Sequence, residues 1–168
     1  MTLRPRRQNA SLDDFQDPLD IYEPPAYADD TERALAEQSV ADMKIAPYKT
    51  VAGRDRVRDA VQTMIDLDIA CVLVVDDQDR LIGIFSERDV QTKLADRFEH
   101  LQHQPVSNFM TPDPTIVHDT DSPAKALNLM AIGGFRHIPV VDADERVVGI
   151  LGPRRITHYL DQIFQQGL

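Results

Sequence analysis

Apolar residues switch between helical and strand spacing along the middle of the chain. From 57 to 65 they recur every three or four residues, which predicts an amphipathic helix. The uninterrupted apolar run at 69–75 predicts a buried strand, the polar residues at 76–79 predict a hairpin loop, and 80–85 predicts the returning strand. Apolar spacing from 90 to 98 then predicts a closing helix. One unit therefore consists of a helix, a β-hairpin and a second helix.

The same order of elements returns 66 residues further along the chain. Residues 51–93 and 117–159 align at this offset without a gap, with eleven identities and mostly apolar residues opposite apolar residues elsewhere. The identical pairs are Val51 and Val117, Asp55 and Asp121, Ala60 and Ala126, Met64 and Met130, Val74-Val75-Asp76 and Val140-Val141-Asp142, Arg80 and Arg146, Gly83-Ile84 and Gly149-Ile150, and Arg88 and Arg154. Agreement over this length indicates an internal duplication.

The second copy marks the start of its first helix with local signals. Ser122 is suited to an N-cap and Pro123 to the first helical position, ahead of an apolar periodicity that continues to position 131. The run at 135–141 predicts the buried strand of this copy, which the same kind of hairpin follows. Apolar spacing from 156 to 164 predicts its closing helix.

Each unit exposes a sheet face that it cannot cover alone, and two units can cover both faces by packing together. We therefore expect an α/β (α+β) fold in which two pseudo-symmetric repeats pack sheet to sheet. The expected divisions are an acidic N-terminal tail with a short helix at 1–38, repeat one at 39–104 and repeat two at 105–168.

The residues ahead of the repeats have a different composition. Eight acidic and no basic residues lie between positions 13 and 32, and prolines interrupt any periodicity. We expect an extended tail followed by a short helix that begins near Asp29. Tyr22 and Tyr27 are expected to pack part of this tail against the repeats or against a second copy of the chain.

Short motifs recur in the two copies in the same order. They are Thr50-Val51, Val74-Val75-Asp76 and GIFSERD at 83–89 in the first copy, and FRHIPVVD at 135–142 and Gly149-Ile150 in the second. Together, in the order β-α-β-β-α, they resemble the CBS domain family over about residues 39–166. The resemblance implies a stand-alone tandem pair of CBS domains that forms a disc-like module, often as a homodimer.

The resemblance also implies a function. CBS modules commonly bind AMP, ATP or related adenosine compounds in clefts between repeats, and transmit ligand occupancy to a partner. It implies a regulatory homodimer that is not an enzyme, with an adenine nucleotide (AMP, ADP or ATP) as its ligand, no other cofactor, and an unidentified effector protein as its partner.

A nucleotide site has to bind a base, a ribose diol and a phosphate. Ser86 and Asp89 lie at a predicted helix start, where the carboxylate can accept hydrogen bonds from ribose hydroxyls and the hydroxyl can donate to a phosphate. The remaining ligand-binding residues that the resemblance implies are Thr50, Ala70, Cys71 and Val72 near the base, and Arg136 and His137 near the phosphate.

Ser86 and Asp89 also have an explanation without a ligand. The sequence SERD is a capping box, in which Ser86 is the N-cap and the Asp89 side chain accepts from its backbone N–H. In the second copy the corresponding residues are Gly152 and Arg155, so that cleft is not expected to bind a ribose in the usual way. Arg154 and Arg155 either bind a different anion there or form a solvated pair.

Composition removes several classes of function. A net charge of −10 argues against nucleic-acid binding, and no apolar run is long enough to span a membrane. The single cysteine excludes an internal disulfide and fits the cytoplasm. His100 and His103 lack the further ligands of a metal site, and no phosphate-binding loop or nucleophile motif occurs. The functions left open are a nucleotide-responsive regulatory module and a ligand-free dimerisation or scaffold module. A third, nucleic-acid binding through Arg4, Arg6, Arg7, Arg154 and Arg155, is opposed by the acidic tail.

Overall fold

The computed structural model describes residues 26–166. Its strands are β1 (Thr50–Ala52), β2 (Cys71–Val75), β3 (Leu81–Ser86), β4 (Thr111–Pro112), β5 (Val117–His118), β6 (Ile138–Val141) and β7 (Val147–Leu151). They form a four-stranded sheet in the order β1-β2-β3-β4 and a three-stranded sheet in the order β5-β6-β7. In both sheets the first strand is parallel to the second, and the hairpin is antiparallel.

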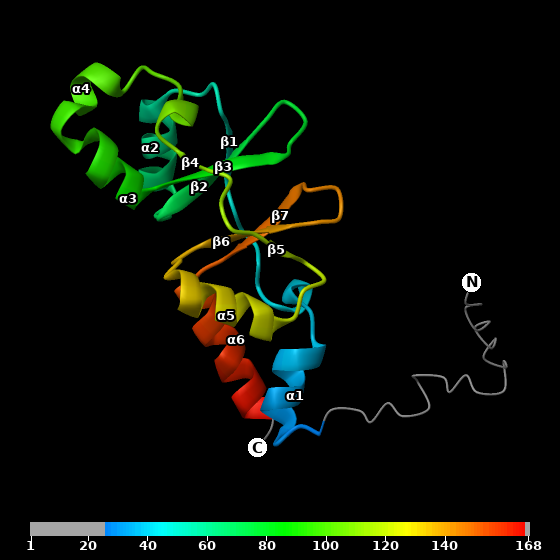
Figure 1. The fold of residues 1–168 in the computed structure, drawn as a ribbon. Coiled ribbons are helices and arrows are strands. Elements are labelled where there is room, and N and C mark those ends of the chain that lie inside the picture. Colours follow the sequence, from blue (N-terminus) through cyan, green and yellow to red (C-terminus); the bar gives the residue numbers. More distant parts are fainter. Residues whose placement is uncertain (1–25, 167–168) are drawn as a thin grey trace, which may run out of the picture.

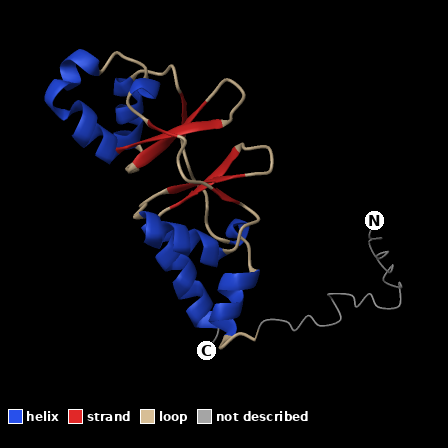
Figure 2. Ribbon diagram, viewed as in Figure 1, coloured by secondary structure: helices blue, strands red, loops and turns tan. Residues whose placement is uncertain are grey.

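Helices cover the outer side of each sheet. The longer ones are α1 (Asp30–Glu37), α2 (Val57–Asp66), α5 (Pro123–Gly133) and α6 (Pro153–Gln166), and the short ones are α3 (Glu87–Asp89) and α4 (Phe98–Leu101). Figure 1 shows α2, α3 and α4 at one end of the molecule and α1, α5 and α6 at the other. The two sheets meet in the middle (Figure 2). This arrangement confirms the predicted α/β fold of two repeats packed sheet to sheet.

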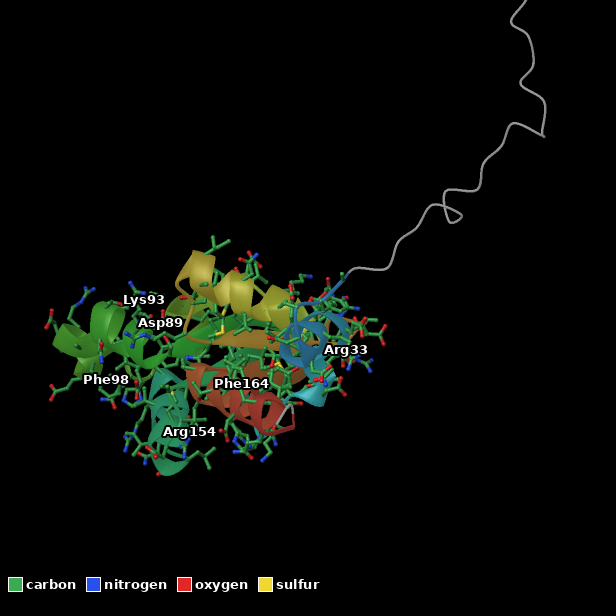
Figure 3. The ribbon with its side chains drawn as sticks, turned by 90° about the horizontal axis from the view of Figure 1, so that it is seen from below. Arg33, Asp89, Lys93, Phe98, Arg154 and Phe164 are labelled. Carbon is green, nitrogen blue, oxygen red and sulfur yellow. The ribbon has the colours of Figure 1, made fainter. Side chains whose placement is uncertain are left out.

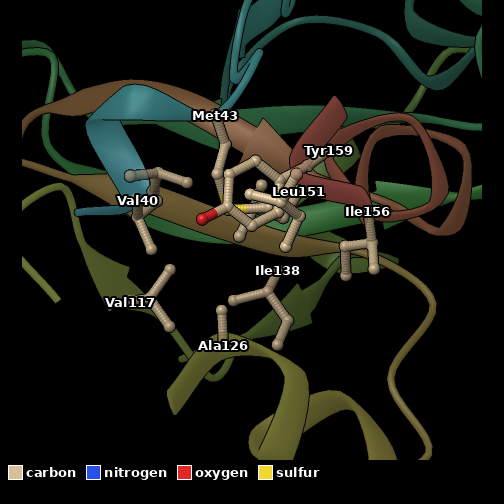
Figure 4. Close-up of a cluster of buried hydrophobic side chains, with 10 residues drawn as sticks. Val40, Met43, Val117, Ala126, Ile138, Leu151, Ile156 and Tyr159 are labelled. Atoms are coloured by element: carbon tan, nitrogen blue, oxygen red, sulfur yellow. The ribbon is translucent and has the colours of Figure 1, made fainter. Parts of the chain in front are cut away.

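Three buried clusters hold the layers together. One lies under the helices of each repeat, and the cluster of repeat two is shown in Figure 4. The third contains Cys71, Leu73 and Ile150, which come from both sheets. Each fully buried aliphatic side chain of this kind contributes about 1.5–3 kcal/mol. Packing between the sheets therefore joins two repeats that would each be incomplete alone.

The identical residues of the duplication make identical turns. Asp76 accepts hydrogen bonds from the backbone N–H groups of Gln78 and Arg80, and Asp142 does the same for the residues at the equivalent positions, 144 and 146. Asp79 has a φ of 61° and Glu145 one of 62°, so both hairpin loops have a left-handed residue at the same position. The hairpins touch through a bridge between Arg80 and Arg146.

The segment that leads into each repeat packs on the other repeat. Val40 and Met43, which precede β1, are buried in the core of repeat two. Val106, Phe109 and Met110, which precede β5, pack in the core of repeat one. The repeats are therefore interlocked through exchanged segments as well as stacked.

Two equivalent glycines permit this exchange. A Cβ atom on Gly83 would lie 2.4 Å from Met110 Sδ, and one on Gly149 would lie 2.5 Å from Ile45 Cβ. The Ile45 carbonyl in turn accepts a hydrogen bond from the Ile150 backbone N–H at 3.0 Å. Glycine occurs at both positions because the crossing segment passes directly over the strand.

The segment that follows β3 was predicted to form one closing helix, and in the structure it does not. It is a series of short turns: α3, a π-helical turn at Val90–Leu94, a 3₁₀ turn at Ala95–Arg97, and α4. Thr92 donates its hydroxyl hydrogen bond to the Arg88 carbonyl, a contact that bends helices. Lys93 reaches away to the carbonyls of Phe109 and Met110. In repeat two, α6 is continuous, as predicted.

The short N-terminal helix is confirmed. Asp29 is its N-cap and accepts from the Glu32 backbone N–H at 2.8 Å. Of the two tyrosines expected to anchor the tail, Tyr27 is half-buried, and Tyr22 lies outside the described residues. No helix in residues 26–166 is long and apolar enough to cross a membrane.

Candidate functional site

A cavity of about 280 Å³ opens between the two repeats. Repeat one contributes the segment before β1 and the residues around the start of β2, and repeat two contributes the residue before β6, one residue of β7 and the start of α6. The lining residues are Pro47, Tyr48, Lys49, Ile69, Ala70, Cys71, Leu73, His137, Ile150, Gly152, Pro153, Arg154 and Arg155. The volume lies near the lower limit for small-molecule sites, which fits a ligand of modest size.

The lining combines apolar and cationic groups. Ile69, Leu73 and Ile150 present aliphatic surface, whereas Lys49 and Arg154 bring positive charge. None of the lining residues is an aspartate or a glutamate, although the whole chain has a net charge of −10. The cavity is therefore suited to a ligand with a flat apolar part and a negative group.

Arg155 holds one wall of the cavity in place. Its Nη1 donates to the Lys44 carbonyl at 3.0 Å, and its Nη2 donates to the Pro47 carbonyl. Tyr48 fixes the same segment, because its hydroxyl donates to the Val147 carbonyl at 3.0 Å. The wall that carries Lys49 is thus tied to repeat two at several points.

His137 lies against the start of α6. A Cβ atom on Gly152 would lie 3.0 Å from the His137 ring, so the glycine that replaces Ser86 in repeat two leaves room for the imidazole. Burial lowers the pKa of His137, and Arg136 and Arg155 lower it further, while Glu87 opposes the shift. His137 is accordingly neutral at neutral pH and can donate or accept a hydrogen bond.

Cys71 is a buried part of the cavity lining. Burial, together with the charge of Glu87, raises the pKa of its thiol to about 12. A thiol protonated over the physiological range is neither a nucleophile nor a metal ligand. Among the described residues, moreover, no group of three or more His, Cys, Asp or Glu side chains is placed to hold a metal ion.

Ser86 and Asp89 form the capping box that the sequence allowed. Asp89 Oδ2 accepts from the Ser86 backbone N–H at 2.9 Å and from its hydroxyl at 2.7 Å. Oδ1 accepts from the Thr111 hydroxyl at 3.0 Å and pairs with Lys93 Nζ at 2.7 Å. Asp89 is only 5% exposed. Burial alone would raise the pKa of this carboxyl, but the bonds from Lys93 and Ser86 hold it below its usual value.

The structure divides the predicted site residues between different places. Ala70, Cys71 and His137 line the cavity, whereas Thr50, Val72, Ser86, Asp89 and Arg136 do not. Figure 3 shows Asp89 and Lys93 on one side of the molecule and Arg154 on the other. The cavity thus belongs to the cleft with Gly152 and Arg155, for which the sequence did not predict a usual ribose site.

Sequence reasoning missed Pro47, Tyr48 and Lys49 as cavity residues. A signal was available, since they directly precede Thr50, the residue expected near a base. The segment before β1 packs against the start of α6 in the other repeat, and nothing in the sequence indicated this packing.

Comparisons of the sequence and of the structure with known proteins both find CBS domain proteins. The family model of the CBS domain matches residues 40–96 and again 106–162. The crystal structure of the CBS-pair protein CBSX2 from Arabidopsis thaliana superimposes with a TM-score of 0.68 at 28% identity, covering 76% of this chain and 96% of that one. A crystal structure of CBSX2 in complex with AMP gives a TM-score of 0.66 at 28% identity, covering 75% and 98%.

Curated protein sequences are similar to this chain over part of their own length. The CBS domain-containing protein CBSCBSPB1 of Arabidopsis thaliana is 29% identical over 115 residues, which are 68% of this chain. The chain spans only 21% of the length of that protein. The similarity therefore concerns the paired repeats.

Proposed function

The chain belongs to the CBS domain family, and from this premise we propose that it is a regulatory module that binds an adenine nucleotide between its repeats. Occupancy of the cavity is signalled to a partner protein. The observation that carries the proposal is the cavity itself, in which an apolar lining meets Lys49, Arg154 and Arg155 and no acidic side chain. An adenine base needs the first property and a phosphate the second.

The relative CBSX2 supports the choice of ligand. A structure of that protein contains AMP, and its fold covers three quarters of this chain at 28% identity. A nucleoside monophosphate is also compatible with a cavity of about 280 Å³. AMP is therefore the first ligand to test, with ADP and ATP as larger members of the same class.

Signalling follows from where the cavity lies. Its lining comes from both repeats, and the wall at Pro47–Lys49 continues through Met43 and Val40 into α1. A ligand that contacts both repeats favours the arrangement in which they are closest to it. A partner that recognises the outer helices can then distinguish the occupied from the empty module.

The ribose contact predicted for Asp89 is not needed for this proposal and stays a prediction. For Asp89 to accept from a ribose, the ligand hydroxyls would have to replace Thr111 and Lys93 at Oδ1, which lie at 3.0 and 2.7 Å. We propose no catalytic activity, because the cavity pairs no activated nucleophile with a base and Cys71 is protonated.

Isothermal titration calorimetry with AMP, ADP and ATP tests the proposal, with GMP as the matched control for the base. We expect micromolar binding of at least one adenine nucleotide and weaker binding of GMP. Absence of heat with all three adenine nucleotides, at protein concentrations that detect micromolar affinity, would reject the proposal.

A ligand-free dimerisation or scaffold module is the second candidate. It is favoured by large apolar side chains that stay exposed near the ends of α2 and α5, namely Ile65 (66%), Leu67 (53%), Ile132 (80%) and Phe135 (41%). This function predicts a melting temperature that rises with protein concentration and does not respond to nucleotides. Sedimentation velocity over a concentration series, with and without AMP, separates the two candidates.

A further inference from the structure

We infer that Lys49 and Arg154 form a phosphate clamp with one cation from each repeat. The inference rests on the proposed function and adds to it the residues that bind the negative group of the ligand. Lys49 immediately precedes β1 of repeat one, and Arg154 is the second residue of α6 in repeat two. Both line the same cavity and both are exposed at its mouth.

The backbones of the two cations are fixed. The Lys49 carbonyl accepts from the Leu73 backbone N–H at 2.9 Å, which joins it to the central strand of the first sheet. The Arg154 carbonyl accepts from the Thr157 hydroxyl at 3.0 Å within α6. The clamp residues are thus long side chains on rigid attachment points, a combination suited to binding a compact anion.

Their charged ends are available, in contrast to that of Arg155. Within residues 26–166, neither the Lys49 ammonium nor the Arg154 guanidinium has a hydrogen bond or an ion pair with a side chain or carbonyl. Arg155 is instead occupied by the carbonyls of Lys44 and Pro47. The neighbouring arginines therefore have separate tasks: Arg155 holds the wall, and Arg154 binds the ligand.

The surroundings favour an anion at this point. No carboxylate lines the cavity, and among the described residues the nearby Glu87, whose charge acts on Cys71 and His137, forms no ion pair with Lys49 or Arg154. Arg154 also lies in the first turn of the 14-residue helix α6, whose dipole adds positive potential. A phosphate between the two side chains would contact both repeats at once. The negative charge of the ligand would therefore hold the two repeats together.

The test compares AMP with adenosine in four proteins: the full chain, Lys49→Ala, Arg154→Ala and Arg88→Ala. Arg88 is the matched control, because it is the same residue at the equivalent position of repeat one, is exposed and does not line the cavity. We expect Arg154→Ala and Lys49→Ala each to weaken AMP binding about tenfold, as for a charge-assisted contact that is partly screened by solvent. Adenosine binding should be unchanged in all four, and Arg154→Lys should retain part of the AMP affinity.

The outcomes separate the clamp from the proposed function. Binding of AMP by the full chain, with no effect of Arg154→Ala or Lys49→Ala, would overturn the clamp and leave the proposed function standing. A loss caused by Arg88→Ala instead would place the phosphate at the opposite cleft and would also overturn it. If the full chain bound neither AMP nor adenosine, the proposed function itself would fail.

Discussion

Asp89 of repeat one and Arg155 of repeat two occupy equivalent positions, and each binds the segment that leads into the other repeat. Asp89 accepts from the Thr111 hydroxyl at 3.0 Å. Arg155 donates to the carbonyls of Lys44 and Pro47. The duplicated position has therefore kept its structural task while its charge has reversed.

The reversal makes the two clefts chemically different. A carboxylate surrounded by Ser86, Thr111 and Lys93 has its acceptor capacity filled. An arginine that binds backbone carbonyls leaves the neighbouring Arg154 free and contributes its own positive charge to the cavity. Only the second arrangement attracts an anion, and this is the reason for assigning the phosphate to the Arg154 side.

Replacement of Asp89 should destabilise the fold. In Asp89→Asn the charge that pairs with Lys93 and accepts from Ser86 and Thr111 is lost from a site that is 5% exposed. We expect a loss of about 2 kcal/mol in the free energy of unfolding, measured by urea denaturation. Asp96→Asn, an exposed change in the same segment, is the control and should have almost no effect. Equal stability of the two variants would contradict the stabilising role of Asp89.

Replacement of Arg155 should affect stability and binding together. Arg155→Ala removes both hydrogen bonds to the wall at Lys44 and Pro47, and we expect a loss of about 1–2 kcal/mol. Because this wall lines the cavity, adenosine should bind more weakly to this variant as well. Arg154→Ala, one residue away, should leave the melting temperature unchanged. A similar melting temperature for both variants would show that the wall does not depend on Arg155.

Gly83 and Gly149, over which the exchanged segments pass, should differ in their tolerance of an added methyl group. The Cβ added by Gly149→Ala would meet Ile45 Cβ at 2.5 Å, an atom fixed to the backbone, and we expect a loss of about 2–3 kcal/mol. In Gly83→Ala the nearest atom is Met110 Sδ at 2.4 Å, on a flexible side chain, and a loss of about 1 kcal/mol is expected. Thermal unfolding of both variants measures which one loses more stability. A larger loss in Gly83→Ala than in Gly149→Ala would contradict this prediction.

The buried histidine predicts a pH dependence of stability. Burial puts the pKa of His137 below its usual value of 6.5 in the folded protein, so the unfolded chain binds a proton more readily. The stabilisation is complete above pH 6.5 and is lost as the pH falls through the folded pKa, by about 1.4 kcal/mol for each unit of difference between the two pKa values. His137→Gln should remove this part of the profile in denaturant unfolding between about pH 7 and pH 5. Parallel profiles for the two proteins would exclude His137 as the cause.

The cysteine should be unreactive in the folded protein. With a thiol pKa of about 12 and 7% exposure, Cys71 has almost no thiolate near neutral pH. Alkylation by iodoacetamide at about pH 8, followed by mass spectrometry, should be at least roughly a hundredfold slower in native buffer than in guanidinium chloride. Comparable rates in both solutions would contradict the burial of this side chain.

Local features of this protein could be read from its sequence. The periodicity of 57–65, the hairpin loops and the caps at Asp29 and Ser122 depend on residues a few positions apart. The duplication at an offset of 66 residues then implied two sheets that cover each other. The capping box at Ser86 was likewise a local alternative, and the structure contains it.

The open cleft and the interlocking of the repeats were decided only in the tertiary structure. The sequence left Asp89 available for a ligand, but Ser86, Thr111 and Lys93 fill its oxygens. Lys49 and Arg154 line one cavity although 105 positions separate them. Such contacts depend on how the exchanged segments pack, and the spacing of apolar residues carries no information about that packing. The sequence by itself determined the two units and their elements, whereas three-dimensional packing determined which side chains are free to bind.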